Sequence, residues 1–297
     1  MATEQTVYLN GEFMPLSEAK VPVLDRGFIF GDGIYEVVPV YAGTPFRWPH
    51  HLARLKRSLA KISIDNPMTD EQWTGLVTDL VARHDWSDQF IYMQITRGVA
   101  KRDHRFPEQY TPTVFAMASE FVPVAPAVLE TGIKTVTMPD ERWLNCDIKS
   151  VSLLGNVLAR QGAADAGATE CLMFRDGLLT EGSSSNIWIV RDDQVFAPKR
   201  DRKILEGIRI GLMQELCDAA GMTLEFRNIP REHVVTADEI LVTSATKEIV
   251  AATMLDGQPV GKGVPGPVFR RLLDAYQEAK RQARLATDSD SAKTATA

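Results

Sequence analysis

Lys149 is a basic side chain in an apolar setting, which makes it a candidate for chemistry. It lies in the stretch CDIKSVSLLGNVL, residues 146–158, where an isoleucine precedes it and a helix-like apolar run follows. One interpretation is that its aliphatic stem packs on these neighbours while the ammonium reaches water. The other is that it is a desolvated amine used for covalent chemistry. The stretch alone favours the first interpretation.

A second candidate is Glu181, the only carboxylate in the stretch TEGSSSN, residues 180–186. A glycine, three serines and an asparagine follow it, which concentrates hydrogen-bonding groups after a predicted strand. A solvated turn that caps a helix would produce the same pattern, and it is the simpler interpretation of the stretch taken alone. The candidate side chains here are Glu181, Ser184, Ser185 and Asn186.

Three further features can hold an anion. The stretch ILEGIRIGL, residues 204–212, places Gly207 at a predicted helix start, where backbone amides can bind a phosphate, although a plain helix entry is the simpler interpretation. The stretch VTSAT, residues 242–246, ends a predicted strand with hydroxyl groups, as an anion-facing turn does. Arg54 lies on a predicted helix face among leucines, so either its guanidinium points inward or its stem covers the core.

Together these groups fit one ligand, pyridoxal phosphate. A lysine amine can form a Schiff base with it, and a lone carboxylate can keep its pyridine nitrogen protonated, so that the ring withdraws electrons. The phosphate-type turns and an arginine can hold its phosphate. The sequence therefore predicts a pyridoxal-phosphate site.

Several other functional motifs are absent. The stretch GDG at 31–33 does not extend to the dinucleotide-binding GxGxxG, and GQPVGKG at 257–263 lacks the spacing and the hydroxyl residue of a P-loop. The stretch GSSSN at 182–186 lacks the second glycine of a GxSxG nucleophile elbow. His50 and His51 are adjacent and no HExxH occurs, so no metal site is expected.

The composition is that of a soluble globular protein. The net charge is −6 and no basic stripe occurs, so no nucleic-acid partner is expected. The three cysteines have no CxxC spacing and suit a reducing cytoplasm. The N-terminus has no signal-peptide pattern, and no apolar run approaches the roughly 18 residues that span a bilayer. We therefore expect a cytoplasmic protein with no membrane partner.

The elements that must position these groups indicate an α+β protein in two lobes. A length of 297 residues suggests two domains of ordinary size. Apolar periodicity and turn residues predict the following elements. The strands are 7–9, 12–14, 34–41, 90–98, 111–121, 132–138, a hairpin over 170–182, 186–190, 194–198 and 239–245, and the helices are 50–62, 70–85, 153–166, 207–220 and 266–285.

A candidate linker divides the chain. The stretch VPVAPAV at 122–128 has two prolines among small residues and lies between predicted strands. It separates a small N-terminal α/β domain, residues 1–121, from a larger domain, residues 129–285. The small, polar residues 286–297 are predicted to be a disordered tail.

The motifs in these positions resemble those of the fold-type IV pyridoxal-phosphate transaminases, most closely the D-amino-acid aminotransferases. The stretches DIKSVSLLGNVLA and TEGSSSN, in this order and spacing, are highly specific, and they favour the covalent interpretation of Lys149. The resemblance covers about residues 6–283. It rests on residues 25–41, 97–107, 142–161, 180–190, 204–208 and 242–249.

The resemblance implies a small N-terminal α/β domain, a larger C-terminal domain with a β-barrel-like core, and a homodimer. It implies that Lys149 is the catalytic, Schiff-base lysine and that Glu181 is the partner of the pyridine nitrogen. The other cofactor-binding positions that it implies are Arg54, Ser184, Ser185, Asn186, Leu205, Gly207, Ile208, Arg209, Ser244 and Ala245.

Two of these positions depart from the family pattern. The family often has a threonine where this chain has Arg209, and a threonine hydroxyl on the phosphate where it has Ala245. Backbone amides at both positions are unaffected by the changes, whereas the hydroxyl contacts are lost. We therefore expect a somewhat lower affinity for phosphate.

The stretch KRDHRFP, residues 101–107, favours one subfamily. In D-amino-acid aminotransferases an Arg-x-His pair on such a loop, with the tyrosine of GDGIYEV, binds the substrate carboxylate. The corresponding residues here are Arg102, His104 and Tyr35. Without the resemblance, Arg102 would be interpreted as a solvated charge in a basic loop.

The resemblance implies a D-amino-acid transaminase that moves an amino group between a D-amino acid, such as D-alanine, and 2-oxoglutarate or pyruvate. An (R)-amine transaminase, a branched-chain transaminase and an aminodeoxychorismate lyase of the same fold are the alternatives. A cofactor-binding protein without catalysis is a further one, although it would not need Lys149 and Glu181 together.

Overall fold

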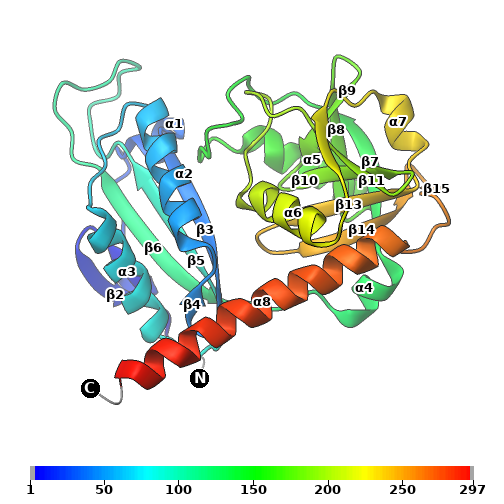
Figure 1. Cartoon of the computed structure of the whole chain (residues 1–297). Helices are drawn as coiled ribbons and strands as arrows, with labels where there is room; N and C mark the ends of the chain where they lie inside the picture. Colours follow the sequence, from blue (N-terminus) through cyan, green and yellow to red (C-terminus); the bar gives the residue numbers. More distant parts are fainter. Residues whose placement is uncertain (1–3, 295–297) are drawn as a thin grey trace. The chain divides into compact units, whose positions relative to one another are not determined.

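The computed structural model describes the backbone of residues 4–294 and the side chains of residues 4–284. Its internal contacts divide the chain into two compact units, which are described separately (Figure 1). Of the described residues, the first unit contains 4–122, the segment Ile148–Ser152 and 283–294. The second contains Pro123–Asp147 and Leu153–Gln282. The segment that carries Lys149 therefore groups with the first unit, although its neighbours in the sequence group with the second.

An antiparallel six-stranded sheet forms the first unit, in the order β2-β1-β6-β5-β3-β4. The hairpin between its first two strands turns at Asn10 and Gly11, whose φ angles of 50° and 106° are those that a two-residue turn requires. The strands are β1 (Thr6–Leu9), β2 (Glu12–Pro15), β3 (Gly33–Tyr41), β4 (Thr44–Pro45), β5 (Gln89–Thr96) and β6 (Thr113–Glu120).

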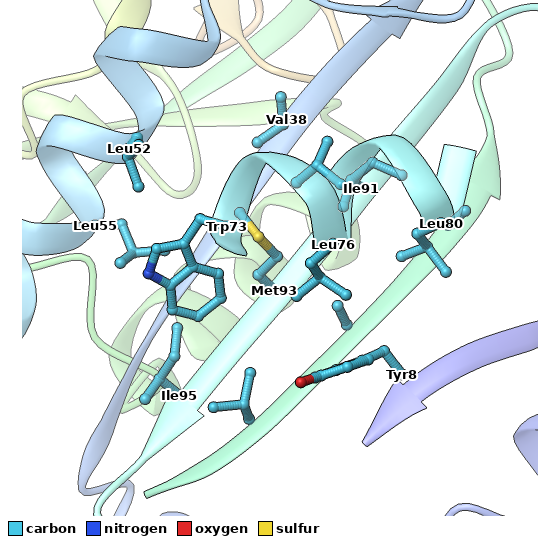
Figure 2. Close-up of a cluster of buried hydrophobic side chains, with 14 of the residues drawn as sticks. Tyr8, Val38, Leu52, Leu55, Trp73, Leu76, Leu80, Ile91, Met93 and Ile95 are labelled. Atoms are coloured by element: carbon cyan, nitrogen blue, oxygen red, sulfur yellow. The ribbon is translucent and has the colours of Figure 1, made fainter. Parts of the chain in front are cut away.

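Two helices, α2 (Trp48–Lys61) and α3 (Asp70–Ala82), pack on this sheet. A capping box begins α3, because Thr69 and Gln72 each accept the other's backbone N–H. Figure 2 shows the core between helices and strands, with the fully buried Trp73 among aliphatic side chains. Burying one such side chain contributes about 1.5–3 kcal/mol. Other labelled members are Tyr8, Val38, Leu52, Leu55, Leu76, Leu80, Ile91, Met93 and Ile95.

Two short helices of this unit, η1 (Leu16–Glu18) and α1 (Arg26–Phe30), were not predicted. The sequence was interpreted as a glycine-rich loop where α1 forms. The Asp25 carboxylate accepts the backbone N–H of Gly27 at 2.8 Å and so caps the start of α1. Gly31, at φ 66°, ends the helix in the left-handed conformation that glycine adopts without strain.

A mixed nine-stranded sheet forms the second unit, in the order β12-β11-β10-β13-β14-β7-β8-β9, with β15 paired to β14. Its central strands β14, β7 and β8 run parallel, whereas the hairpins at its flanks are antiparallel. The strands are β7 (Ile133–Pro139), β8 (Glu170–Arg175), β9 (Leu178–Gly182), β10 (Asn186–Arg191), β11 (Gln194–Pro198), β12 (Leu224–Arg227), β13 (Glu239–Ser244), β14 (Glu248–Leu255) and β15 (Gln258–Pro259).

The helices of this unit differ from the predictions in three places, one of which is α7, a short helix that was not predicted. The candidate linker 122–128 contains the start of a helix that begins at a proline, and the closing helix runs to Thr294, where a disordered tail was expected. The last three residues of that tail, 295–297, lie outside the described residues. The helices are α4 (Pro126–Thr131), α5 (Leu154–Asp165), α6 (Ile208–Ala219), α7 (Arg231–Val235) and α8 (Pro267–Thr294).

The α+β class predicted from the sequence is confirmed, with a small antiparallel sheet and a larger, curled sheet (Figure 1). The strands β4, β12, β14 and β15 were not predicted. All three cysteines are buried free thiols, Cys146, Cys171 and Cys217. No helix within residues 4–294 combines the length and the apolarity that crossing a membrane demands.

Candidate active site

Backbone pairing fixes the position of Lys149 in the first unit. The Tyr35 N–H donates to the Lys149 carbonyl at 2.9 Å, and the Val151 N–H donates to the Gly33 carbonyl at 3.1 Å. The Lys149 N–H in turn lies 3.4 Å from the hydroxyl of Ser58, a buried residue of α2. The segment 148–152 is thus held along the start of β3, and its lysine cannot shift along the strand without losing these bonds.

The Lys149 ammonium lies over an aromatic ring. Its Nζ atom is 4.0 Å from the centroid of Tyr35, and Tyr35 itself stacks on Tyr92 at 5.7 Å. Within the described residues, no carboxylate forms an ion pair with Lys149.

Arg54 is buried on α2 and is bound by a carboxylate of β3. Its Nε and Nη2 atoms donate to the two oxygens of Glu36 at 2.7 and 2.8 Å, and His51 Nδ1 lies 2.9 Å from the same carboxylate. Burial by itself would raise the pKa of Glu36, but the Arg54 charge and hydrogen bonds hold it far below the usual range. Arg54 is therefore rigidly oriented, and its contact with a phosphate stays a prediction.

Arg102 and His104 lie on an exposed loop and turn toward one ring. The Arg102 guanidinium carbon is 5.5 Å from the centroid of Phe30, and the His104 ring is 5.3 Å from it. Arg26 Nη1 donates to the Asp103 carbonyl at 2.6 Å and supports the loop between them. The two side chains thus lie near the same ring, but among the described residues no hydrogen bond or ring contact joins either of them to Tyr35.

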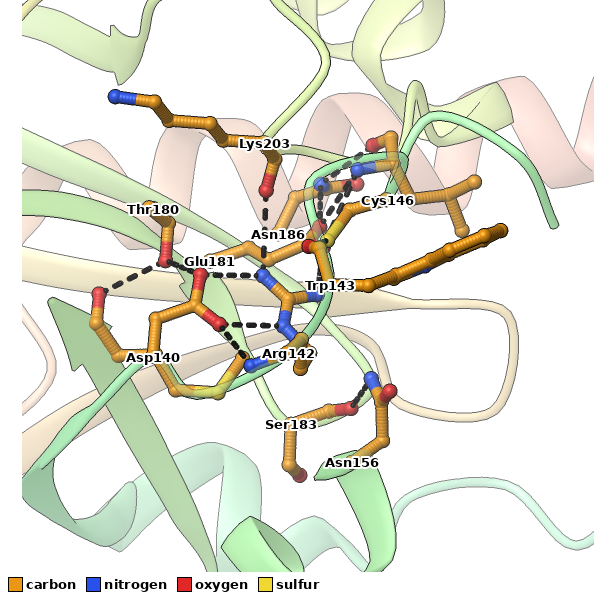
Figure 3. Close-up of polar contacts among 12 residues, drawn as sticks. Asp140, Arg142, Trp143, Cys146, Asn156, Thr180, Glu181, Ser183, Asn186 and Lys203 are labelled. Atoms are coloured by element: carbon orange, nitrogen blue, oxygen red, sulfur yellow. Dashed lines mark hydrogen bonds and ion pairs between the residues drawn. The ribbon is translucent and has the colours of Figure 1, made fainter. Parts of the chain in front are cut away.

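Glu181 lies on β9 in the second unit, with only 4% of its surface exposed. Figure 3 shows that Arg142 donates to it and, at the same time, to both oxygens of Asp140 at 2.9 Å. The Leu205 N–H lies 3.2 Å from each Glu181 oxygen. Arg142 therefore donates hydrogen bonds to two buried carboxylates at once.

Burial raises the pKa of Glu181 to about 7. The charge and hydrogen bond of Arg142 and the hydrogen bond from the Leu205 N–H lower this pKa, but they do not offset the lost hydration of the carboxylate. The nearby charge of Asp140 adds to this rise. Asp140 itself loses water too, but its hydrogen bonds with Arg142 outweigh that loss and lower its pKa. A Glu181 carboxylate in this state gains stability from any cation brought next to it.

Asn186 connects Glu181 to the start of α6. Its side-chain nitrogen donates to the Leu205 carbonyl at 3.1 Å and to Glu181 Oε2 at 3.3 Å. Gly207 packs directly on this amide, since a Cβ atom at 207 would lie 2.2 Å from Asn186 Oδ1. The glycine that was predicted at a phosphate-binding helix start is thus required by a close contact.

The two predicted phosphate turns lie in this unit. Helix α6 begins at Ile208, and no side chain caps the free N–H groups of its first turn. Strand β13 ends at Ser244, whose hydroxyl accepts the Lys247 N–H at 3.0 Å. Arg209 joins the two turns, because its Nη2 donates to the Ala245 carbonyl at 3.2 Å. Free amides, a hydroxyl and a guanidinium therefore converge, which is chemistry suited to a phosphate.

The serines of TEGSSSN divide between surface and interior. Ser184 is exposed, whereas the hydroxyl of Ser185 donates at 2.9 Å to Glu170, a fully buried residue of β8. Lys247 Nζ donates to the same carboxylate at 3.0 Å. The structure thus shows a structural partner for Ser185, and cofactor contacts by either serine stay predictions.

Two side chains that hold predicted site residues in place were not predicted from the sequence: Glu36, which binds Arg54, and Arg142, which binds Glu181. Glu36 shares its strand face with Ile34 and Val38, so alternation alone places a carboxylate in the core, where it needs a cationic partner. Arg142 precedes Lys149 in a polar stretch and gave no periodic signal. Residues 4–284 contain no group of His, Cys, Asp and Glu side chains that could hold a metal ion.

Comparison with known proteins adds independent evidence. D-alanine aminotransferase of Bacillus licheniformis is 37% identical over 273 residues, which cover 91% of this chain and 95% of that protein. The branched-chain amino acid aminotransferase of T.th., solved with pyridoxamine 5′-phosphate, has a TM-score of 0.88 at 25% identity, with 96% of each chain covered. The branched-chain amino acid aminotransferase of Escherichia coli, at 23% identity, shares the fold with the same TM-score over 93% of this chain and 94% of that one.

The family model of amino-transferase class IV matches residues 33–255. These bounds coincide with the start of β3 and the end of β14, so the match contains both Lys149 and Glu181. The resemblance on which the sequence analysis relied is confirmed by this match and by the 37% identical relative. The chain therefore belongs to the amino-transferase class IV family.

Proposed function

We propose that this chain is a pyridoxal-phosphate-dependent transaminase that moves the amino group between a D-amino acid, such as D-alanine, and a 2-oxo acid. The observation that carries the proposal is the 37% identity to a D-alanine aminotransferase over 91% of the chain. The Arg-x-His loop, with both side chains turned to Phe30, supports the choice of D-amino acids.

The groups described above fit the cofactor. Pyridoxal phosphate, when bound, supplies a protonated ring that withdraws electrons from the substrate's α-carbon. Lys149 holds it covalently, and Glu181 pairs with its ring nitrogen. The α6 amides at Ile208 and Arg209, the Ser244–Ala245 turn and Arg54 hold its phosphate. The raised pKa of Glu181 supports this role, since a cationic ring nitrogen would add positive charge to a carboxylate whose arginine partner, Arg142, is shared with Asp140.

Lys149 is the acid and base of the reaction. Its neutral Nζ accepts the proton from the α-carbon of the substrate and donates a proton again as the product forms. Tyr35 limits where this atom can go, because its ring lies 4.0 Å away. Segment 148–152 is bonded to β3, so the amine returns to one position in each cycle.

Arg102, His104 and Tyr35 bind the substrate carboxylate in this proposal. A guanidinium presents two parallel donors that match a carboxylate. Within the described part of one chain, no hydrogen bond or ring contact joins Tyr35 to either of the other two, and we propose that the chain acts as a homodimer in which both subunits contribute to carboxylate binding. Sedimentation velocity of the purified protein tests this, and a monomer with full activity would contradict it.

Reduction with borohydride tests the lysine assignment. We expect a yellow protein in which the cofactor becomes fixed to Lys149, as located by peptide mapping. The Lys149→Ala variant should retain cofactor but lose nearly all turnover, whereas Lys134→Ala, at an exposed position of β7, should behave as wild type. An adduct on another lysine would refute the assignment.

A substrate panel tests the specificity. Purified protein is incubated with D-alanine, L-alanine, L-leucine or (R)-1-phenylethylamine, each with 2-oxoglutarate and with pyruvate. D-alanine should react fastest. A preference for L-leucine would instead make the chain a branched-chain transaminase, and a preference for the amine an (R)-amine transaminase.

The Arg102→Ala variant, assayed with the same substrates, tests whether Arg102 binds the substrate carboxylate. It should lower kcat/KM for D-alanine by at least about tenfold, because a charge-assisted contact contributes about 1.5–3 kcal/mol. Activity on the amine, which has no carboxylate, should fall much less. The matched control is Arg105→Ala on the same loop, whose arginine pairs with Asp103. Equal losses on both substrates would show that Arg102 supports the loop and does not bind the carboxylate.

The free, buried thiols of Cys146, Cys171 and Cys217 also support a location in a reducing cytoplasm. Fractionation of cells that express the native chain tests this part of the proposal. Recovery of the protein outside the cytoplasmic fraction would contradict it.

A further inference from the structure

Arg209 is a buried charge without an anionic partner. Its side chain lies near the start of α6 with 5% of its surface exposed. The Nη2 atom donates to the Tyr276 hydroxyl at 2.7 Å and to the Ala245 carbonyl at 3.2 Å. The Nε atom is buried and has no hydrogen-bond partner in the described part of the chain. Neutral oxygens are thus the acceptors of a full positive charge.

The other buried arginines are different. Arg26 and Arg97 both pair with Asp32, at 2.7 and 2.8 Å, and Arg54 pairs with Glu36 at 2.7 Å. Removing a charge from water is costly unless an opposite charge accompanies it. Of the buried arginines in residues 4–284, Arg209 alone forms no ion pair with a carboxylate. Its guanidinium lies 5.6 Å from the centroid of the Tyr276 ring, so its neighbours are an aromatic ring and neutral oxygens.

The location of this arginine identifies the class of anion. Arg209 lies in the first turn of α6, whose N–H groups have no side-chain cap, and it contacts the carbonyl of the turn that follows β13. Free helix N–H groups and a guanidinium together favour a phosphate dianion over a smaller or neutral ligand.

The contact also joins the two positions that depart from the family pattern. Threonine is the frequent residue at both, and here the arginine at 209 touches the alanine at 245. The acceptor in this contact is the backbone carbonyl of Ala245, so the two departures lie next to each other in the fold.

We propose that Arg209 and Ala245 form a matched pair in which the guanidinium replaces two hydroxyl groups as the donor to the cofactor's phosphate. This inference rests on the proposed function, since the phosphate is that of pyridoxal phosphate. It reverses the expectation of a lower phosphate affinity, because a charge-assisted donor is stronger than a neutral hydroxyl. It also predicts that threonine at both positions lowers phosphate binding less than threonine at position 209 alone.

Titration of cofactor-free protein tests the pair without measuring turnover. Dissociation constants are measured for pyridoxal phosphate and for pyridoxal, which lacks the phosphate, and thermal melting is recorded with and without inorganic phosphate. Arg209→Thr should weaken pyridoxal phosphate at least about tenfold and leave pyridoxal within about twofold. Inorganic phosphate should raise the melting temperature of wild type but not of this variant.

Three further variants complete the test. Arg209→Lys, which keeps the charge, should retain most of the phosphate binding, and the double variant Arg209→Thr with Ala245→Thr should recover part of what Arg209→Thr loses. Tyr276→Phe keeps the arginine but removes one of its acceptors, so it should leave phosphate binding within about twofold if the anion is the main partner. If Tyr276→Phe lowers the affinity for pyridoxal phosphate as much as Arg209→Thr does, the role of Arg209 is to connect α6 to α8 and not to bind the phosphate.

The outcomes separate this inference from the proposed function. Wild type that binds neither pyridoxal phosphate nor pyridoxal would refute the function itself. Wild type that binds pyridoxal phosphate, with Arg209→Thr unchanged or equally weak toward pyridoxal, would refute only the role of Arg209. Additivity of the two threonine substitutions would show that positions 209 and 245 are independent.

Discussion

The two units each bury a glutamate against an arginine, yet the two carboxylates are in opposite states. Glu36 receives both donors of one edge of Arg54 and a contact from His51, and its pKa is lowered. Glu181 receives one nitrogen of Arg142, which directs its other donors to Asp140, and its pKa is raised to about 7.

The difference shows that a buried glutamate paired with an arginine can either stabilise the fold or remain able to bind a further cation. The Glu36 carboxylate, which accepts two donors of Arg54 and lies beside His51, needs no further cation, so it fixes a helix against a strand. An under-satisfied carboxylate such as Glu181 is held in place by Leu205 and Asn186 but retains affinity for a cation. Raised carboxylate pKa values are typical of functional sites for this reason.

The largest expected effect comes from breaking the satisfied pair. Glu36→Gln removes the carboxylate that pairs with the buried Arg54, which should lower the free energy of unfolding by about 3–5 kcal/mol. Urea denaturation of the cofactor-free protein measures this. Glu12→Gln, at an exposed position of β2, is the control. A loss below about 1 kcal/mol would show that water or His51 compensates for the missing charge.

Removing the other carboxylate should affect catalysis more than stability. Glu181→Gln takes away the anionic partner of the ring nitrogen, and the loss of a charge-assisted bond of about 1.5–3 kcal/mol implies a 10- to 150-fold fall in kcat. Arg142 keeps Asp140, so the cofactor-free protein should unfold within about 1 kcal/mol of wild type. Glu225→Gln on the exposed edge of β12 is the control. Unchanged kcat would remove Glu181 from the mechanism.

The pH dependence of stability should differ between the two carboxylates. The pKa of Glu181 is about 7 in the folded protein against an ordinary value of 4.5, so the folded state binds its proton more tightly than the unfolded chain. Stability of cofactor-free protein should therefore fall as pH rises from about 4.5 to about 7. Relative to Glu181→Gln, wild type should lose on the order of 1–3 kcal/mol between pH 5 and pH 8. Parallel profiles would mean that Glu181 ionises normally.

The smallest expected effect is a shift of the pKa of Glu181, which tests why Glu181 and Glu36 differ. Asp140→Asn removes a negative charge that raises the pKa of Glu181 and frees Arg142 for it. The pH window of the preceding profile should then move below about 7, toward the behaviour of Glu36. Only the position of the window matters, since Asp140 also accepts Thr180 and Arg175 and its loss lowers stability in general. A window that does not move would exclude Asp140 as the cause.

The residues that we propose to touch cofactor and substrate were predicted from the sequence, whereas their buried charge partners Glu36 and Arg142 were not. Lys149 and Glu181 lie in stretches of characteristic order and spacing, so their importance was evident before any fold was known. The partnership of Glu36 with Arg54 joins a strand to a helix, and local periodicity says nothing about which buried charges will meet.

The fold shows the same division. Long amphipathic segments such as α2 and α3 were predicted, because their apolar spacing is strong. Short elements were missed, although α1 has an aspartate cap and a terminal glycine that are recognisable afterwards. The contact between Arg209 and Ala245 was beyond prediction, because it depends on how a helix start and a strand end approach each other.

The close approach of Gly207 to Asn186 has a consequence for directed evolution. Any side chain at 207 collides with an amide that also holds Glu181, so the two sites are epistatic: neither can be varied freely in the background of the other. A library randomised at 207 alone should return wild type, while a smaller residue at 186 would admit alanine at 207 only by loosening the carboxylate. Efforts to widen the substrate range would therefore start from the exposed 101–106 loop, which is proposed to bind the substrate carboxylate.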